Sequence, residues 1–394
     1  MKTKLLSPLV TRFLLVIMLC LPVWGNQVSA QTPESYAVLD KATSTLTFRH
    51  DAKKPAGAYP LNGPEELPGW FVEGENFVNK NRIEKVVLDA SFAAARPTSC
   101  RCWFVGCTEL KTIEGIEYLN TENVVTMKSM FAFCNNLTAL DVSNFNTKNM
   151  TDMNSMFYEC NNLTTLNVSN FDTQNVTNMG WMFYGCNNIT TLNVSNFDTK
   201  KVTNMKSMFA FCNNLTTLNV TNFDTKNVTD MSGMFAFCNN LTTLNVTNFD
   251  TKNVTDMYAM FYECNNLTTL NVSNFDTKNV TDMTQMFHGC NNLTTIYVSE
   301  KFVTTACEYG DEMFKDCGKL VGAVPFDENK TGMEMANYTT GYFTDIKTTG
   351  IDATPISDNI AAKYYDVQGR RMDAPQKGIN IVKRGGRTMK VLMK

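Results

Sequence analysis

Histidine is nearly absent from this sequence. Its 394 residues include only His50 and His288, and they are far apart in the chain. Catalytic triads and most zinc sites need histidine beside a nucleophile or other ligands. A glycine-rich phosphate loop, a calcium-binding loop and a dinucleotide fingerprint are also missing. We therefore expect a protein that is not an enzyme and has neither a cofactor nor a metal site.

Long apolar runs are scarce as well. Phe13–Leu21 is apolar throughout, but nine residues are too few to span a bilayer. This run follows basic residues and precedes small ones, which predicts a signal peptide over residues 1–30 with cleavage after Ala30. Cys20 leaves a lipoprotein anchor open as an alternative. No later run is long enough for a membrane helix, so we expect an exported protein without a transmembrane span.

Basic charge is in short supply over most of the chain. The net charge is −3, but residues 31–346 carry −12 and residues 347–394 carry +6. Nucleic-acid binding requires a basic surface. The acidic body therefore argues against a nucleic-acid partner.

Cysteine marks an internal repeat. Seven cysteines follow one another at intervals of 26 residues, and Cys107 and Cys317 flank the series at intervals of 27. The seven are Cys134, Cys160, Cys186, Cys212, Cys238, Cys264 and Cys290. Regular spacing of this kind is the signature of a repeat protein.

Each repeat has two apolar patterns. The first, L-x-x-L-x-V-x-x-F from Leu163, is typical of the strand and turn of a leucine-rich repeat. The second begins at Val176 with apolar residues at i, i+3, i+6, i+7 and i+10, which favours a short helix or 3₁₀ segment. One unit cannot enclose its own apolar side chains, whereas stacked units cover each other.

The predicted fold is an α/β repeat solenoid, leucine-rich-repeat-like, with about nine turns of 26 residues over residues 100–317. Residues 31–99 lack the period and form the expected N-terminal cap, with strand-like runs at Thr45–Phe48 and Val86–Leu88. Residues 318–345 form the expected C-terminal cap, and residues 346–394 a β-rich tail. The Asn-Asn pair after each cysteine should form a hydrogen-bonded ladder.

The cysteines lack the spacing of zinc ligands. We interpret the column as buried thiols that act as small apolar residues. Disulfides among Cys100, Cys102, Cys107 and Cys307 stay open in an oxidising compartment.

The repeat wording resembles a known family. The segment "NFDTKNVTDMSGMFAFC" is similar to the repeat of BspA-like leucine-rich repeat surface proteins, and the resemblance extends over about Ala95–Cys317. The closing "GYFT" at Gly341–Thr344 is similar as well. The resemblance implies a bacterial surface protein or adhesin. Implied partners are extracellular-matrix proteins such as fibronectin or fibrinogen, and other bacteria.

The tail carries a second resemblance. "YYDVQGRRM" (Tyr364–Met372), "KGINIV" (Lys377–Val382) and "MKVLMK" (Met389–Lys394) resemble a type IX secretion C-terminal sorting signal. These segments predict three short strands with turns at Gln368-Gly369 and Gly385-Gly386. The tail is shorter than the full sorting domain, so a plain β-rich end piece is the alternative. The resemblance implies secretion to the outer cell surface of a Gram-negative bacterium.

Variation between the copies indicates where a ligand would bind. The strand segment "LTTLNV" hardly varies between the repeats. Thr165 and Asn167 of this segment should point outward. Aromatic residues gather in the more variable half, where part-exposed rings are common binding anchors. The candidate ligand-binding residues are Tyr158, Trp181, Tyr184, Phe211, Phe237, Tyr258, Tyr262 and His288. The alternative is that these rings only cover the outer edge of the solenoid.

The sequence thus predicts a cell-surface adhesin or binding protein. It would recognise a host matrix protein, another bacterium or a polysaccharide through a solenoid face. The alternative is a structural surface spacer without a specific ligand. An ice-binding role of the threonine rows is a third, weaker interpretation.

Overall fold

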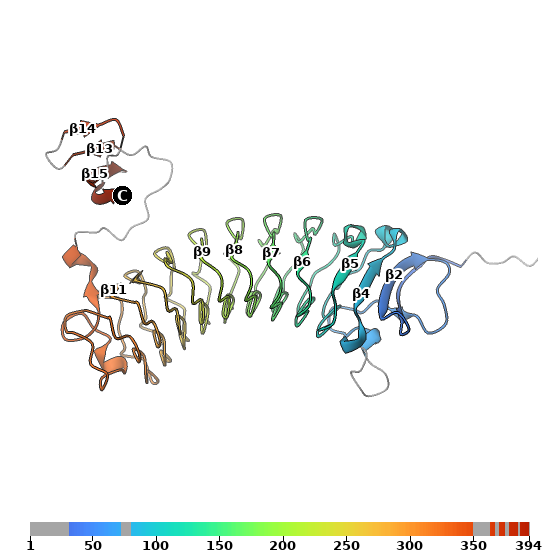
Figure 1. Cartoon of the computed structure of the whole chain (residues 1–394), viewed down its shortest axis with the longest axis horizontal. Helices are drawn as coiled ribbons and strands as arrows, with labels where there is room; N and C mark the ends of the chain where they lie inside the picture. Colours follow the sequence, from blue (N-terminus) through green and yellow to red (C-terminus); the bar gives the residue numbers. More distant parts are fainter. Residues whose placement is uncertain are drawn as a thin grey trace, which may run out of the picture.

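The computed structural model describes residues 31–71, 80–349, 363–366, 370–374, 378–384 and 387–393. A small sheet at the amino-terminal end is followed by a gently curved row of similar turns stacked side by side (Figure 1). The expected signal peptide and its cleavage site after Ala30 lie outside the described residues.

A five-stranded sheet of order β3-β1-β2-β4-β5 begins in the amino-terminal cap and ends with β5 in the first turn of the solenoid. Its strands are β1 (Glu34–Asp40), β2 (Thr45–Asp51), β3 (Tyr59–Pro60), β4 (Lys85–Leu88) and β5 (Thr112–Glu114). β1 pairs with β2 and β3 antiparallel, whereas β2, β4 and β5 pair in parallel. The cap therefore changes from antiparallel to parallel pairing, and the chain enters the solenoid with parallel pairing. The predicted strands at Thr45–Phe48 and Val86–Leu88 are confirmed.

Two buried tryptophans close the first turn. Phe48 stacks on Trp103, with ring centroids 4.9 Å apart, and Trp70 packs edge-on against both. The indole nitrogen of Trp70 donates to the Trp103 carbonyl oxygen at 3.0 Å, and that of Trp103 donates to Asn62 Oδ1 at 2.8 Å. Because both indole N–H groups have partners, this aromatic plug is buried without an unpaired donor.

The solenoid core contains the nine apolar side chains of each repeat. In the turn that begins at Leu163, none of the nine exceeds 6% exposure. The phenylalanines after the second repeat methionine form one column, with neighbouring ring centroids 5.7 to 5.9 Å apart. The column consists of Phe131, Phe157, Phe183, Phe209, Phe235, Phe261, Phe287 and Phe314. The prediction of a repeat solenoid is confirmed.

One side of the solenoid, the strand side, carries short parallel strands. They are β6 (Ala139–Leu140), β7 (Thr165–Leu166), β8 (Thr191–Leu192), β9 (Thr217–Leu218), β10 (Thr269–Asn271) and β11 (Thr295–Val298). β6 pairs with β7, β8 with β9, and β10 with β11. In β9 the leucine is buried and the threonine exposed, as the L-x-x-L-x-V pattern predicts.

The other side, the turn side, differs from the prediction. The expected helix or 3₁₀ segment is a run of overlapping tight turns, and the described residues between Leu119 and Gly332 contain no helix. The N–H groups of Met156 and Tyr158 bond the carbonyls three residues back. The N–H groups of Ser155 and Phe157 instead bond carbonyls of the next turn, at 2.9 Å each.

This alternation explains why no helix forms. Beyond its first turn, a helix bonds every N–H group internally, whereas here every second N–H group bonds a carbonyl of the neighbouring turn. Ser155 and Glu159, whose N–H groups both bond the next turn, have a positive φ of 56°, which no residue of a right-handed helix has. The apolar spacing fits both structures, because either one places residues three and four apart on the same side.

The asparagine ladder is confirmed for the second residue of each pair, whereas the side-chain oxygens of Asn187, Asn213 and Asn239, at the first position, are buried without a hydrogen-bond partner. Asn188 Nδ2 donates to Asn162 Oδ1 at 3.4 Å, Asn214 to Asn188 at 3.3 Å, and Asn240 to Asn214 at 3.4 Å. The amides thus bond one turn to the next at the corner between the two sides.

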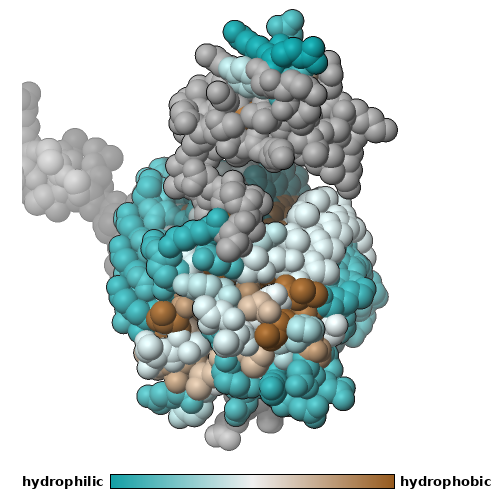
Figure 2. Space-filling model, turned by 90° about the vertical axis from the view of Figure 1, so that its left-hand side faces the viewer, coloured by the Kyte–Doolittle hydropathy of each residue, from teal (hydrophilic) through white to brown (hydrophobic). Residues whose placement is uncertain are grey.

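The carboxy-terminal cap closes the other end of the core. β12 (Thr344–Asp345) adds to β11 in parallel, and Tyr342 and Phe343 pack edge-on against Phe314, the last ring of the column. Seen from this end, the surface is mostly hydrophilic or neutral with small hydrophobic patches (Figure 2). The cap therefore covers apolar surface that the last turn would otherwise expose.

The tail forms an antiparallel sheet of order β14-β13-β15-β16. Its strands are β13 (Lys363–Tyr365), β14 (Arg371–Met372), β15 (Gly378–Arg384) and β16 (Arg387–Met393). The prediction of a small sheet is confirmed, but the segment Tyr364–Met372 contributes two strands where one was expected. The predicted turns at Gln368-Gly369 and Gly385-Gly386 lie outside the described residues.

Candidate functional site

One aromatic ring per turn stands on the turn side, and neighbouring rings contact each other. Consecutive ring centroids are 4.2 to 5.0 Å apart. These rings, here called the aromatic ladder, are Phe133, Tyr158, Tyr184, Phe211, Phe237, Tyr262 and His288. Sequence reasoning named all of them except Phe133, which is 43% exposed.

The ring of each turn comes from one of two sequence motifs. In Phe-Tyr-x-Cys turns it lies two residues before the cysteine, as in Tyr184. In Phe-Ala-Phe-Cys turns it lies one residue before the cysteine, as in Phe211, and Ala210 takes the place of the tyrosine. Phe211 has a φ of +58°, and its ring still contacts that of Tyr184 at 5.0 Å.

A cavity forms where the motif changes from Phe-Tyr-x-Cys to Phe-Ala-Phe-Cys. Two consecutive turns carry alanine at the tyrosine position, Ala210 and Ala236, and Gly233 lies between them. All three are buried and line a cavity of about 370 Å³ that Tyr184 and Tyr262 also line. Sequence reasoning missed the cavity because it depends on side chains that are small, although the change from Phe-Tyr-x-Cys to Phe-Ala-Phe-Cys signals it.

A second row of side chains borders the ladder. The Lys206 ammonium lies 5.7 Å from the Trp181 ring centroid, an arrangement that attracts a cation to the ring face. Lys206 and Tyr258 line the cavity, and Tyr258 is 44% exposed. Trp181 and Tyr258 are the two candidate residues outside the ladder. Tyr258 lines the cavity, and Trp181 lies beside Lys206.

His288 ends the ladder and is buried, at 7% exposure. Its Nδ1 lies 3.6 Å from a Glu312 carboxylate oxygen and its Nε2 lies 3.5 Å from one of Asp316. A ring enclosed in this way offers little surface to a ligand, so we do not include His288 in the proposed binding surface.

Three carboxylates stack next to the second row. Parallel bridges join Asp230, Asp256 and Asp282 in successive turns, and each side chain accepts a backbone N–H two residues on. Burial raises the pKa of Asp256, and the neighbouring charges of Asp230 and Asp282 raise it further. The protein thus has a negative stripe close to the cavity.

The cysteine column carries no reactive chemistry. The Cys186 thiol donates to the Phe157 carbonyl of the preceding turn at 3.3 Å, and the other column thiols repeat this bond. Burial raises the pKa of Cys160 and Cys212 to about 12, so both stay protonated and poorly nucleophilic. Within the described ranges, no three His, Cys, Asp or Glu side chains form a group that could hold a metal ion.

A family model matches residues 98–217, 161–243 and 236–344, which together span more than half of the chain. Its description is "Mycoplasma protein of unknown function, DUF285". The chain belongs to the DUF285 family. The DUF285 segments contain the whole aromatic ladder and the cavity. No curated protein matches the chain.

Among solved structures, the chain is similar to a leucine rich cell surface protein from Faecalibacterium prausnitzii A2-165. The two are 15% identical, the match covers 72% of this chain and 91% of that one, and the TM-score is 0.27. Within the part of this DUF285 protein that the structure describes, no helix is long and apolar enough to cross a membrane.

Proposed function

We propose that this protein is a non-enzymatic adhesin that binds a host matrix protein, another bacterium or a polysaccharide at the bacterial surface. Fibronectin and fibrinogen are the first matrix proteins to test. The observation that carries the proposal is the cavity of about 370 Å³ within the aromatic ladder. Aromatic rings around a small, preformed depression are typical of the anchoring points of protein interfaces.

The variation between turns supports this site. Most of the solenoid repeats its words almost unchanged, but the cavity requires Ala210, Gly233 and Ala236 in adjacent turns. Tyr258, which is exposed, and Lys206, which is partly exposed, add a phenol group and a positive charge to the lining. A partner with an exposed apolar group would match the cavity, whereas the negative stripe beside it disfavours a carboxylate.

The proposal includes the location and the repeat number. A cleaved signal peptide over residues 1–30 would direct export, and the tail would act as a type IX sorting signal of a Gram-negative bacterium. The four-stranded tail sheet is compatible with such a role. A solenoid of about nine turns of 26 residues agrees with the parallel bridges that join Ser99 to Tyr309 in successive steps.

A structural spacer is the second candidate. It is favoured by the hydrogen-bond ladders, which repeat with nearly the same distances from turn to turn. Turns that repeat so regularly form an extended, uniform structure, and a protein that only spans a distance needs no specific ligand.

Binding of the full chain to immobilised fibronectin, to fibrinogen and to whole bacteria tests the proposal. Tyr258→Ala removes an exposed cavity wall and should weaken binding at least tenfold. Tyr309→Ala is the matched control, because Tyr309 is 60% exposed and does not line the cavity. If no target binds, the spacer is the better description. If a target binds and both variants bind it as the original chain does, the cavity is not the binding site.

A further inference from the structure

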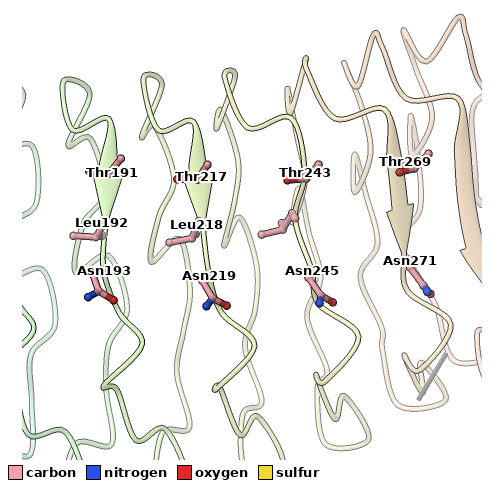
Figure 3. A pocket seen from close by; sticks show the side chains of 11 residues that line it. Thr191, Leu192, Asn193, Thr217, Leu218, Asn219, Thr243, Asn245, Thr269 and Asn271 are labelled. Carbon is pink, nitrogen blue, oxygen red and sulfur yellow. The ribbon is translucent and has the colours of Figure 1, made fainter. Parts of the chain in front are cut away.

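A second hollow lies on the strand side, away from the aromatic ladder. It has a volume of about 600 Å³ and runs across four turns (Figure 3). One edge is a row of threonines that includes Thr217 and Thr243, and the other is a row of asparagines that includes Asn219 and Asn245. We call it the strand-side groove.

The groove floor consists of leucines from the core. Leu192, Leu218 and Leu244 are 6 to 7% exposed, whereas Leu270 of the next turn is 1% exposed. The floor is thus a narrow apolar strip between two polar rows. None of the described residues that line the groove is charged.

The backbone fixes how each asparagine amide is oriented. Asn219 Oδ1 accepts the backbone N–H of Thr221 at 3.1 Å and its hydroxyl at 2.7 Å. Asn245 Oδ1 accepts the same two groups of Thr247 at the same distances. Because the oxygen faces the backbone, the amide nitrogen is left to donate outward.

These donors recur with the spacing of the turns. Thr191 pairs with Thr217 in register, as parallel strands about 4.8 Å apart do. Among the described residues of the next turn, Thr243 and Leu244 belong to no strand, so the groove is centred where the strand pairing is interrupted. The outward amides and hydroxyls therefore form two rows along the solenoid axis, with one asparagine and one threonine from each turn.

The chemistry of the groove selects its ligand. Outward N–H groups require acceptors, the uncharged lining disfavours ionic polymers, and the leucine strip suits the C–H face of a sugar ring. An extended peptide advances about 3.3 Å per residue and would fall out of register with the turns. One sugar ring of an extended, equatorially linked chain is about as long as one strand spacing.

We propose that the strand-side groove binds a linear, uncharged polysaccharide that lies along the solenoid axis, with one sugar ring per turn. This inference rests on the proposed surface-binding function and adds a second site to it. Asn219 and Asn245 donate hydrogen bonds to sugar oxygens, and the neighbouring threonine hydroxyls donate or accept.

An aspartate already occupies the asparagine position in one turn of this protein, which suggests a substitution that preserves the fold. Asp141 occupies the asparagine position of an earlier turn, and its carboxylate accepts the N–H of Ser143 at 2.9 Å. Asn219→Asp with Asn245→Asp should therefore keep the backbone contact and the fold but replace two outward donors with negative acceptors. Asn167→Asp makes the same change in the same row outside the groove and is the matched control.

Calorimetric titration of the full chain with neutral cello-, xylo-, manno- and chito-oligosaccharides tests the proposal. At least one series should bind, with affinity rising from two to four sugar units as more turns are engaged. The double variant should bind at least tenfold more weakly at an unchanged unfolding temperature, while Asn167→Asp binds normally.

Absence of binding in all four series would overturn the proposal, and so would equal affinity of the double variant and the original chain. Inhibition of ice recrystallisation that the double variant loses, without sugar binding, would assign the rows to water and also overturn it. Matrix-protein binding and its loss in Tyr258→Ala are measured on the same samples, so a failure of the groove is distinguishable from a failure of the proposed adhesin.

Discussion

The carboxyl group of Glu263 lies over the α-carbon of Gly289, one turn further along the solenoid. A Cβ built on Gly289 would stand 2.6 Å from the Glu263 carboxyl carbon, closer than two carbons can approach. Gly289 also has a φ of +72°. Space and backbone conformation thus both favour glycine at this turn, although Glu159 and Glu263 hold the same left-handed conformation at the equivalent position of their own turns.

Gly289→Ala should therefore lower the free energy of unfolding by about 1 to 2 kcal/mol, through left-handed strain and displacement of the Glu263 side chain. Urea denaturation followed by circular dichroism measures this. Gly318→Ala is the control, since its Cβ would meet no atom within 4 Å and its φ is not positive. Equal losses at the two sites would contradict the overlap.

Leu218→Asp should destabilise the protein by about 3 kcal/mol or more, because it places a charge without a partner in the core. Thr217→Asp should change the free energy of unfolding by less than about 0.5 kcal/mol, since that side chain faces solvent. Chemical denaturation of both variants compares them directly. Similar effects would contradict the assignment of Leu218 to the inward face and Thr217 to the outward face.

Stability should fall as the pH rises from about 9 towards 12. Burial raises the pKa of Cys160, Cys212 and Cys264 from 9.0 to about 12, so the folded chain keeps these protons after the unfolded chain has lost them. Ionisation therefore favours the unfolded state above pH 9, by roughly 1 kcal/mol per thiol at pH 10.

Denaturation in reductant at pH 8 and pH 10 measures this loss. Cys212→Ala should be less stable at pH 8, because it leaves a cavity, but should lose less stability between the two pH values. An unchanged pH dependence in Cys212→Ala would show that other groups, such as the tyrosines, account for the effect.

Removing residues 350–394 should leave the solenoid folded but keep the protein from the cell surface. The cut must spare β12 and the segment after it, because Lys347 forms an ion pair with Glu300 at 2.8 Å. Cell fractionation and protease treatment of intact cells locate the truncated chain, which we expect in the periplasm. A truncated chain that is still exposed outside the cell would make the tail an end piece without a sorting role.

The sequence predicted the core well because burial follows the period. Leu163, Val168 and Met179 recur at fixed intervals, and each stacked turn gives them the same surroundings. The turn side was less accessible to sequence reasoning. Whether the N–H of Phe157 bonds within its own turn or to the next depends on tertiary stacking, and no local pattern distinguishes the two.

The candidate site shows the same division. Tyr158 and Tyr184 were found because aromatic residues stand out in the variable positions. Phe133 was missed although it holds the same position in a Phe-Ala-Phe-Cys motif as Phe211 and Phe237, because the repeats that were compared begin one turn later, with Tyr158. The strand-side groove was missed because it arises where strand pairing is interrupted, while the words of that turn are almost unchanged.

The stitching of alternate N–H groups on the turn side also has a mechanical consequence. These hydrogen bonds run along the solenoid axis, from Ser155 to Gly180 and onward through each following turn. A pull on the two ends of the solenoid loads all of these sets in series, and the weakest set breaks first, so that turns separate one at a time. A protein tethered at one end and held by a partner at the other would then lengthen in steps and absorb the load of a moving cell.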